Sequence, residues 1–187
     1  MRKLTYYVAA TMDGFIATDD GHVDFFGGGG DHAAALKAKY PEAVPTKIRE
    51  ALGLKGGSTF DTVLFGRKTY DFGVRTGTSN PFSHLKQVVV STTLGESPDP
   101  AIELVSSDPA GYVRDLKQKP GKGIWLCGGG ELAGSLVEEI DQIYLKLFPM
   151  VLGSGRPLIA GSSLQKFHMV GHQIFEDGVI FIKYSRH

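Results

Sequence analysis

Residues 124–136 read IWLCGGGELAGSL, a short apolar strand followed by three consecutive glycines and a helical segment. Glycine lets the backbone approach a ligand closely, and the free N–H groups at a helix start favour an anion such as a diphosphate. Gly128, Gly130 and Ala133 satisfy the spacing G-x-G-x-x-G/A, which is a weak signal on its own. The stretch comes late in the chain and lacks the acid that follows about 20 residues later in dinucleotide-binding units. It therefore predicts either a diphosphate site or a tight glycine turn that packing requires.

Strands and helices alternate along the rest of the chain. Apolar runs and turn signals predict strands over residues 4–10, 15–17, 62–65, 87–91, 102–105, 123–127, 142–148, 168–175 and 179–184. They predict helices over residues 32–40, 46–54, 109–119 and 131–138, a helical turn from Lys68, and Asp31 as a helix cap. Residues 176–178 read EDG, which indicates a hairpin turn. The pattern predicts one α/β domain over residues 1–187, with a largely parallel sheet and an antiparallel edge.

The composition excludes several classes of protein. Twenty basic and twenty acidic residues give a formal net charge of zero, which disfavours nucleic acid and anionic membranes as partners. The single cysteine, Cys127, rules out an internal disulfide and a multi-cysteine metal site, and we expect it to be buried rather than nucleophilic. No apolar run reaches the roughly 18 residues of a membrane span, and the start is too polar for a secretory signal, so we expect a cytoplasmic protein. Glycine is in excess, at 25 of 187 residues, which predicts close approaches of backbone to backbone or to a ligand.

A second motif, VLFGRKTYDFG at residues 63–73, carries positive charge. Gly66, Arg67, Lys68 and Thr69 follow a short buried strand, so they should reach the sheet edge where ligands of α/β proteins collect. Arginine offers a fork of donors, lysine a point charge and threonine a hydroxyl, and this set suits a phosphate monoester. The alternative is a solvated basic corner without a ligand.

A third motif, VVVSTT at residues 88–93, ends a central strand. Ser91 and Thr92 could hydrogen-bond a ribose phosphate, or they could simply cap a turn. No segment matches the P-loop pattern G-x-x-x-x-G-K-[ST], which disfavours nucleotide hydrolysis. His168 and His172 share a face of a predicted strand, but no nearby carboxylate set completes a metal site.

The motifs occur in the order YYVAATMDGFIA, VLFGRKTY, VVVST, WLCGGGEL and LFPMVLGSGRPLI over nearly the whole chain. Together they resemble the dihydrofolate-reductase-like superfamily. They look closest to the RibD C-terminal family, the reductase domain of the bifunctional riboflavin-biosynthesis deaminase-reductase. The resemblance implies a dihydrofolate-reductase-like three-layer sandwich, with a mostly parallel central sheet and a C-terminal antiparallel hairpin. It also implies a homodimer, with the β-rich tail as a possible interface.

The resemblance further implies an NADPH-dependent reductase and a place for the cofactor. Ala10 and Ile16 would border the nicotinamide. Next to Gly66, the residues Arg67, Lys68 and Thr69 would hold the adenosine 2′-phosphate and the adjacent diphosphate, which favours NADPH over NADH. The residues facing the adenosine ribose phosphate would be Ser91 and Thr92. Those wrapping the diphosphate and the nicotinamide ribose would be Gly128, Gly129, Gly130, Glu131 and Leu132.

The substrate side departs from true dihydrofolate reductases, which have a Trp-Pro loop followed by an acidic residue on the first helix. Residues 19–32 read DDGHVDFFGGGGDH, without Trp-Pro, and Asp31 is the nearest acid. The acids best placed for catalysis are Asp13 and Glu131, although Asp13 could instead form a turn. Residues 27–30, four glycines, lie where the superfamily has its active-site lid, and the alternative there is a flexible connector.

Three functions are therefore in competition. The first is hydride transfer from NADPH to a pyrimidine- or pteridine-like heterocycle, as in reduction of 5-amino-6-(5-phosphoribosylamino)uracil in riboflavin biosynthesis. The second is dihydrofolate reduction. The third is NADP(H) binding without turnover. Since the chain has no room for a fused deaminase domain, we expect a stand-alone member that acts on a small heterocycle.

Overall fold

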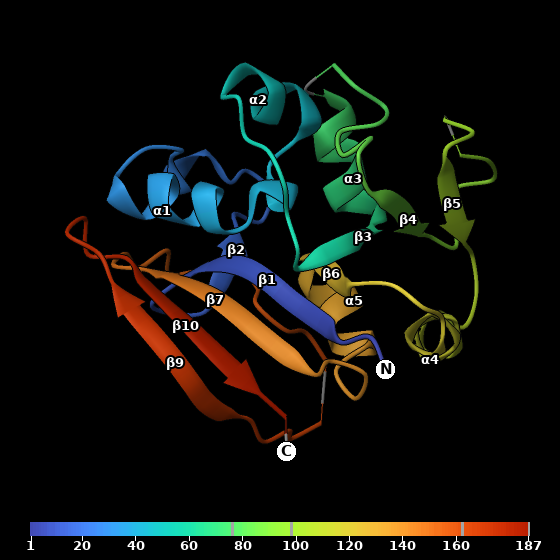
Figure 1. Cartoon of the computed structure of the whole chain (residues 1–187). Coiled ribbons are helices and arrows are strands. Elements are labelled where there is room, and N and C mark those ends of the chain that lie inside the picture. The colour runs from blue at the N-terminus through green and yellow to red at the C-terminus, as the bar shows by residue number, and fades with distance from the viewer. Residues whose placement is uncertain (76, 98, 162, 187) are drawn as a thin grey trace.

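The computed structural model describes residues 1–75, 77–97, 99–161 and 163–186. Within them, eight strands form one sheet in the order β5-β4-β3-β6-β1-β7-β10-β9 (Figure 1). Their bounds are β1 Leu4–Thr11, β3 Phe60–Gly66, β4 Lys86–Val90, β5 Ile102–Val105, β6 Gly123–Gly128, β7 Gln142–Phe148, β9 His168–Ile174 and β10 Ile180–Ser185. A second, two-stranded sheet joins β2 (Phe15–Ala17) to β8 (Arg156–Pro157).

Six of the strands in the large sheet run parallel. β1 pairs in parallel with β6 and β7, and β3 does so with β6 and β4, which in turn pairs with β5. β10 pairs antiparallel with β7 and β9, so the tail forms the hairpin that the sequence predicted. The predicted α/β fold with a C-terminal antiparallel hairpin is confirmed. Because the six strands point the same way, the residues that follow Thr11, Gly66, Val90 and Gly128 meet at one edge, the carboxyl edge of the sheet.

Helices cover both faces of the sheet and make three layers (Figure 1). Their bounds are α1 Asp31–Lys39, α2 Thr46–Ala51, α3 Arg67–Arg75, α4 Pro109–Gln118 and α5 Gly130–Ser135, with short 3-10 turns η1 at Asp24–Phe26 and η2 at Pro41–Ala43. On one face, Leu36 of α1 and Tyr70 of α3 join a buried aromatic cluster. On the other face, Leu116 of α4 and Leu132 of α5 join a mainly aliphatic cluster.

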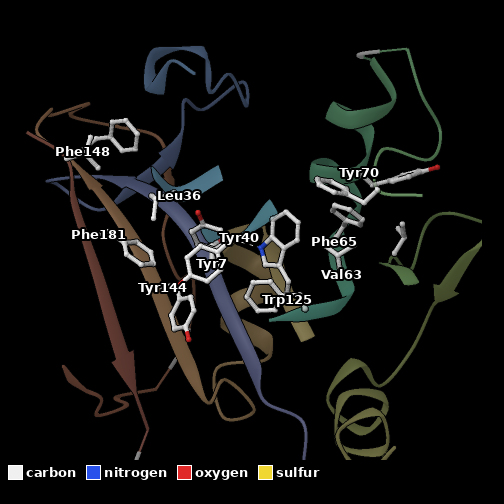
Figure 2. Close-up of a cluster of buried hydrophobic side chains, with 14 of the residues drawn as sticks. Tyr7, Leu36, Tyr40, Val63, Phe65, Tyr70, Trp125, Tyr144, Phe148 and Phe181 are labelled. Carbon is white, nitrogen blue, oxygen red and sulfur yellow. Dashed lines mark hydrogen bonds between the residues drawn. The ribbon is translucent and has the colours of Figure 1, made fainter. Parts of the chain in front are cut away.

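Strand alternation sorts the side chains between these two clusters. In β1, Tyr6 and Val8 face the aliphatic cluster, whereas Tyr7 faces the aromatic one. The ring centroid of Tyr7 lies 5.3 Å from that of Tyr40 and 6.4 Å from that of Tyr144 (Figure 2). The aromatic cluster therefore anchors the end of α1 to the middle of the sheet.

The structure corrects three local expectations. Residues 15–17 do not continue the first strand, because β2 pairs with β8 in the separate sheet. α5 ends at Ser135, earlier than predicted. Asp31 is the first residue of α1 rather than its cap, and its carboxylate accepts hydrogen bonds from the backbone N–H groups of Glu176 and Asp177 at 2.9 and 3.3 Å. It thus ties α1 to the β9–β10 turn.

The described residues contain neither a membrane-crossing helix nor a cluster of metal ligands. None of the helices there has the length and apolar character that crossing a bilayer requires. In the same part of the chain, no group of three histidine, cysteine or carboxylate side chains is arranged to hold a metal ion.

Candidate functional site

The glycine turn and the start of α3 meet at the carboxyl edge of the sheet. β3 and β6 are neighbours, and Phe65 pairs with Gly128. The hydroxyl Oγ1 of Thr69 lies 3.7 Å from the place where a Cβ would stand at Gly128, and 3.6 Å from the corresponding place at Gly129. We call Gly66–Thr69 together with residues 128–131 the α3–α5 corner. Bringing these two motifs together was the main expectation for the site, and their adjacency is confirmed.

The three glycines of the turn have different surroundings. A Cβ on Gly130 would overlap the carbonyl oxygen of Pro157 and lie 3.2 Å from its carbonyl carbon. The carbonyl of Gly130 also accepts a hydrogen bond of 3.0 Å from the N–H of Ala160. At Gly128 and Gly129, only the Thr69 hydroxyl comes near, at ordinary contact distance, and the peptide bond between these two glycines is cis. Packing therefore explains why residue 130 is glycine. At Gly128 and Gly129 the backbone is left without a side chain and faces Thr69.

Both cations of the corner are paired with acids. Nε of Arg67 donates to both carboxylate oxygens of Asp71 at 2.8 Å, which ties the guanidinium to a residue one turn further along α3. Nζ of Lys68 lies 3.3 Å from Oε1 of Glu131, with side-chain exposures of 63% and 79%. An ion pair this exposed contributes only about 0–1 kcal/mol, so an anionic ligand could take Lys68 from Glu131 at little cost. The corner can thus present an oriented arginine and a releasable lysine to a phosphate.

Ser91 and Thr92 differ in exposure. Ser91 is buried, and its hydroxyl accepts hydrogen bonds from the N–H groups of Thr93 and Leu94 at 3.2 and 3.1 Å. This is the turn-capping geometry that the sequence left open for it. Thr92 is exposed beside it at the carboxyl edge. A contact of either residue with a ribose phosphate stays a prediction.

The residues expected beside the nicotinamide lie at the end of β1 and in β2. Ala10 is 1% exposed, backbone included, so the structure leaves it almost no surface that could border a ligand. Ile16 is half-buried and packs against the aliphatic cluster. Leu132, expected at the diphosphate, is buried in the same cluster. Of these three residues, Ile16 alone keeps side-chain surface that a ligand could reach.

Asp13 holds a loop in place. Its carboxylate accepts from Oγ1 of Thr11 at 2.5 Å and from the N–H groups of Leu152 and Gly153 at 3.1 and 2.7 Å. The hydrogen bond from Thr11, with those from Gly153 and Leu152, lowers the pKa of the Asp13 carboxyl below its ordinary value. At neutral pH this group is therefore ionised and carries no proton to deliver. Its contacts match the turn-forming alternative.

Asp13→Asn should release the loop from Leu152 to Gly155 while the sheet stays intact. Asparagine offers one acceptor oxygen instead of two, so the amides of Leu152 and Gly153 should exchange hydrogen several-fold faster. Because the pKa of Asp13 is lowered, its hydrogen bonds to Leu152 and Gly153 are fully present above the ordinary pKa of aspartate, about 3.9. They weaken as the pH falls through the lowered value.

Amide hydrogen exchange followed by NMR measures this directly. Asp20→Asn is the control, since Asp20 also accepts from a threonine two residues earlier, Thr18, but contacts His22 rather than the loop. Unchanged hydrogen exchange at Leu152 and Gly153 in Asp13→Asn would show that the Asp13 carboxylate does not hold this loop.

The other acids occupy different settings. Glu131 is exposed beside the glycine turn, and its observed partner is Lys68. Asp31 is engaged by the β9–β10 turn and does not stand free on α1, as an acid serving a folate-like ring would. Cys127 is half-buried rather than fully buried as expected, and desolvation raises the pKa of its thiol to about 12, which does not suit a nucleophile.

Two polar residues near this edge were not singled out by the sequence. His32 is buried at the start of α1, paired with Asp177 and packed edge-on against Phe148. Lys146 lies in β7 on the face that carries the aromatic cluster. The sequence signal for Lys146 was a charged residue within the otherwise largely apolar strand QIYLKLF.

Comparison with known sequences places the chain in a group. Residues 2–181 match the RibD C-terminal domain family. The uncharacterized protein YwjB of Bacillus subtilis (strain 168) is 30% identical over 162 residues, which cover 84% of this chain and 82% of that protein. The uncharacterized protein YyaP of the same organism is 28% identical, with coverage of 98% and 94%.

Solved structures show the same fold. A "putative riboflavin biosynthesis protein" from Shewanella sp. PV-4 superposes with a TM-score of 0.73 at 22% identity, over 100% of this chain and 99% of the other. A diaminohydroxyphosphoribosylaminopyrimidine deaminase/5-amino-6-(5-phosphoribosylamino)uracil reductase from Thermotoga maritima gives a TM-score of 0.67 at 16% identity, and 57% of that longer chain is covered, against 100% of this one. Dihydrofolate reductase from Enterococcus faecalis, complexed with NADP(H) and RAB-propyl, gives 0.64 at 13% identity, with coverage of 98% of this chain and 96% of the enzyme.

Proposed function

The chain belongs to the RibD C-terminal domain family, and on that premise we propose that it is an NADPH-dependent reductase of a pyrimidine- or pteridine-like heterocycle. The observation that carries the proposal is the α3–α5 corner. There the Thr69 hydroxyl lies against bare backbone at Gly128 and Gly129, and the exposed Lys68 reaches Glu131 just after them. Arg67 begins the same helix as these two donors, with its guanidinium held by Asp71. A dinucleotide with a 2′-phosphate carries two anionic groups, that phosphate and the diphosphate bridge, and this donor set suits both.

The residues of the corner fit NADPH chemically. Arg67 would offer its guanidinium to the 2′-phosphate, and Lys68 would leave Glu131 to neutralise part of the same charge. Thr69 and the backbone at Gly128 and Gly129 would hold the diphosphate without a side chain in the way. The bound nicotinamide would supply the hydride. The role of the protein is then to hold the ring near Ile16 of β2, just beyond the end of β1, against a flat substrate.

Proton delivery is assigned to Glu131 rather than Asp13. Asp13 is kept ionised by the bonds that latch the loop, whereas Glu131 is exposed and bound only by a weak surface pair. Displacement of Lys68 by a phosphate would free the Glu131 carboxylate beside the glycine turn. The freed carboxylate would then orient a solvent-connected water molecule, from which the proton would reach the substrate.

Single contacts in the structure bear on the two competing functions, dihydrofolate reduction and NADP(H) binding without turnover. Dihydrofolate reduction is disfavoured because Asp31, the nearest acid on α1, is occupied by the backbone of Glu176 and Asp177. NADP(H) binding without turnover is favoured only by the exposure of Glu131, which leaves no buried acid at the corner.

Turnover with a panel of heterocycles separates these functions. We expect loss of NADPH absorbance when the protein meets a ribosylaminopyrimidine phosphate, and a much slower loss, or none, with dihydrofolate. Faster turnover of dihydrofolate would favour the second function. Tight NADPH binding with no turnover on any heterocycle of the panel would favour the third.

We also propose that the protein works in the cytoplasm as a homodimer, joined through β9. The strand lies at the edge of the sheet, and Met169, Val170 and Ile174 on it are 57%, 53% and 68% exposed. Unpaired edges and exposed apolar side chains are a common basis for pairing between copies. The molar mass in solution, measured by light scattering, tests this, and a monomer at micromolar concentration would refute it.

A further inference from the structure

Lys146 stands where the pattern of β7 calls for an apolar side chain. Along the strand, Ile143 and Leu145 face the aliphatic cluster, while Tyr144 and Phe148 face the aromatic one. Lys146 lies between Tyr144 and Phe148 and therefore shares their face. A charged residue on the inner face of a strand costs stability, so a functional role is the usual reason for its presence.

The surroundings of the Lys146 ammonium group do not neutralise it. Nζ lies 5.0 Å from the ring centroid of Tyr7, and in the described part of the chain it takes part in none of the ion pairs or hydrogen bonds found. Burial lowers the pKa of Lys146, Cys127 opposes this, and the like charge of Lys37 lowers it further. The N–H groups of Lys146 thus have no hydrogen-bond acceptor among the described residues, and a cation–π contact with Tyr7 is the interaction found for them.

Lys146 also lies near the carboxyl edge of the sheet, where the proposed site is. Its strand partners are Ala9 of β1 and Phe181 of β10, and β7 ends two residues later at Phe148, at the carboxyl edge. Its ammonium group interacts electrostatically with Cys127, the residue before the glycine turn, and with Lys37 of α1. Lys146 therefore lies on the face of the sheet that α1 covers, between that helix and the strand that leads to the glycine turn.

A second lysine on the same face shows what a purely structural role looks like. Nζ of Lys183 lies 4.8 Å from the ring centroid of Tyr144, 5.6 Å from that of Tyr40 and 5.8 Å from that of Phe181. Figure 2 shows these three rings packed together on neighbouring elements. Lys183 pairs with Tyr144, nearer the opposite end of β7, and three rings surround its charge. It provides a matched control for Lys146.

We propose that the Lys146 ammonium group binds the substrate by donating a hydrogen bond to a ring carbonyl oxygen of its heterocycle. This rests on the proposed function, which supplies the heterocycle. A phosphate would need several donors, and Lys37, the neighbouring cation, already donates to the carbonyl of Gly28 at 3.0 Å. A ring carbonyl needs one donor, and Lys146 offers one beside an aromatic face.

Calorimetric titration with two probes tests this inference. The probes are diaminouracil, which has the ring carbonyls but no sugar, and ribose phosphate, which has the phosphate but no ring. We expect Lys146→Met to weaken diaminouracil binding by about 10- to 100-fold, the value of a hydrogen bond to a charged group, and to leave ribose phosphate unaffected. Lys183→Met should bind both probes like the wild type. The melting temperature of Lys146→Met should be equal to or above that of the wild type, because an apolar side chain suits that face.

The outcomes separate this inference from the proposed function. Equal diaminouracil affinity in the wild type and Lys146→Met would overturn it, and so would the absence of diaminouracil binding to the wild type. A loss of ribose phosphate binding alone would assign the lysine to a phosphate and would also overturn it. The titrations are run with and without NADPH. If NADPH does not bind but diaminouracil binding depends on Lys146, the proposed function fails and the subsite stands.

Discussion

Gly134→Ala is expected to destabilise the protein by roughly 3 kcal/mol or more. A Cβ at this position would overlap the carbonyl oxygen of Ala160 and lie 2.8 Å from its carbonyl carbon. Both atoms are backbone, and the N–H of Ala160 is already bonded to the carbonyl of Gly130. Alanine should gain about 1 kcal/mol over glycine from helix propensity, so the clash has to exceed that gain. Gly130→Ala should act in the same direction through Pro157.

Urea denaturation of the variants measures the effect. Gly29→Ala is the control, because nothing lies within 4 Å of its Cβ position and its φ is not in the left-handed region. That variant should be as stable as the wild type, or up to about 1 kcal/mol more stable. If Gly134→Ala unfolds at the wild-type urea concentration, then residues 157–160 do not pack on α5 as described.

Arg67→Ala is expected to weaken NADPH binding by about 10- to 100-fold, the value of a lost bond between charged groups. NADH lacks the 2′-phosphate, so its affinity should change by less than about threefold. The structure supports an arginine effect larger than a lysine effect. Asp71 orients the Arg67 guanidinium, whereas the Lys68 side chain is 63% exposed and is held only by a surface ion pair with Glu131.

Fluorescence titration with each cofactor gives the two dissociation constants. Arg75→Ala is the matched control, since it removes the same charge from the other end of α3, away from the glycine turn. An equal loss for NADPH and NADH in Arg67→Ala would exclude a 2′-phosphate role. An equal effect of Arg75→Ala would show that only the net charge of the helix matters.

Much of the fold followed from local patterns. The strands over residues 102–105 and 142–148 were predicted with their observed bounds, because apolar runs and turn signals mark strand ends directly. Parallel strands end at one edge, so the meeting of Arg67–Thr69 with Gly128 and Gly129 could also be predicted. The resemblance supplied the expectation of three layers and of a nicotinamide cofactor.

What the sequence did not reveal depends on contacts between distant segments. The pairing of β2 with β8 and the need for glycine at Gly130 both come from residues 156–160, which lie far from their partners along the chain. An aspartate just before a helical stretch predicts a helix cap, which is why Asp31 was expected to be one. The β9–β10 turn that binds Asp31 lies about 145 residues away in the sequence, so no local pattern indicates this contact. Lys146 was missed because its strand was assigned from its apolar residues, and the one charge among them was not weighed.

The glycine excess has three causes. Fourteen of the described glycines have a positive φ, a backbone conformation that glycine adopts without steric cost. Gly130, Gly134 and Gly155 lie against backbone carbonyl oxygens of other segments, where no side chain fits. Gly128 and Gly129 have room and face Thr69, which leaves them available to a ligand. Ligand binding is therefore tested at these two glycines and at the basic residues beside them.

Titration of the wild-type protein with NADPH and with NADH, followed by cofactor fluorescence, tests the central claim most directly. If the α3–α5 corner holds the 2′-phosphate, NADPH should bind at micromolar concentration and at least about tenfold more tightly than NADH. Absence of NADPH binding at millimolar concentration would contradict the assignment of this protein as an NADPH-dependent reductase.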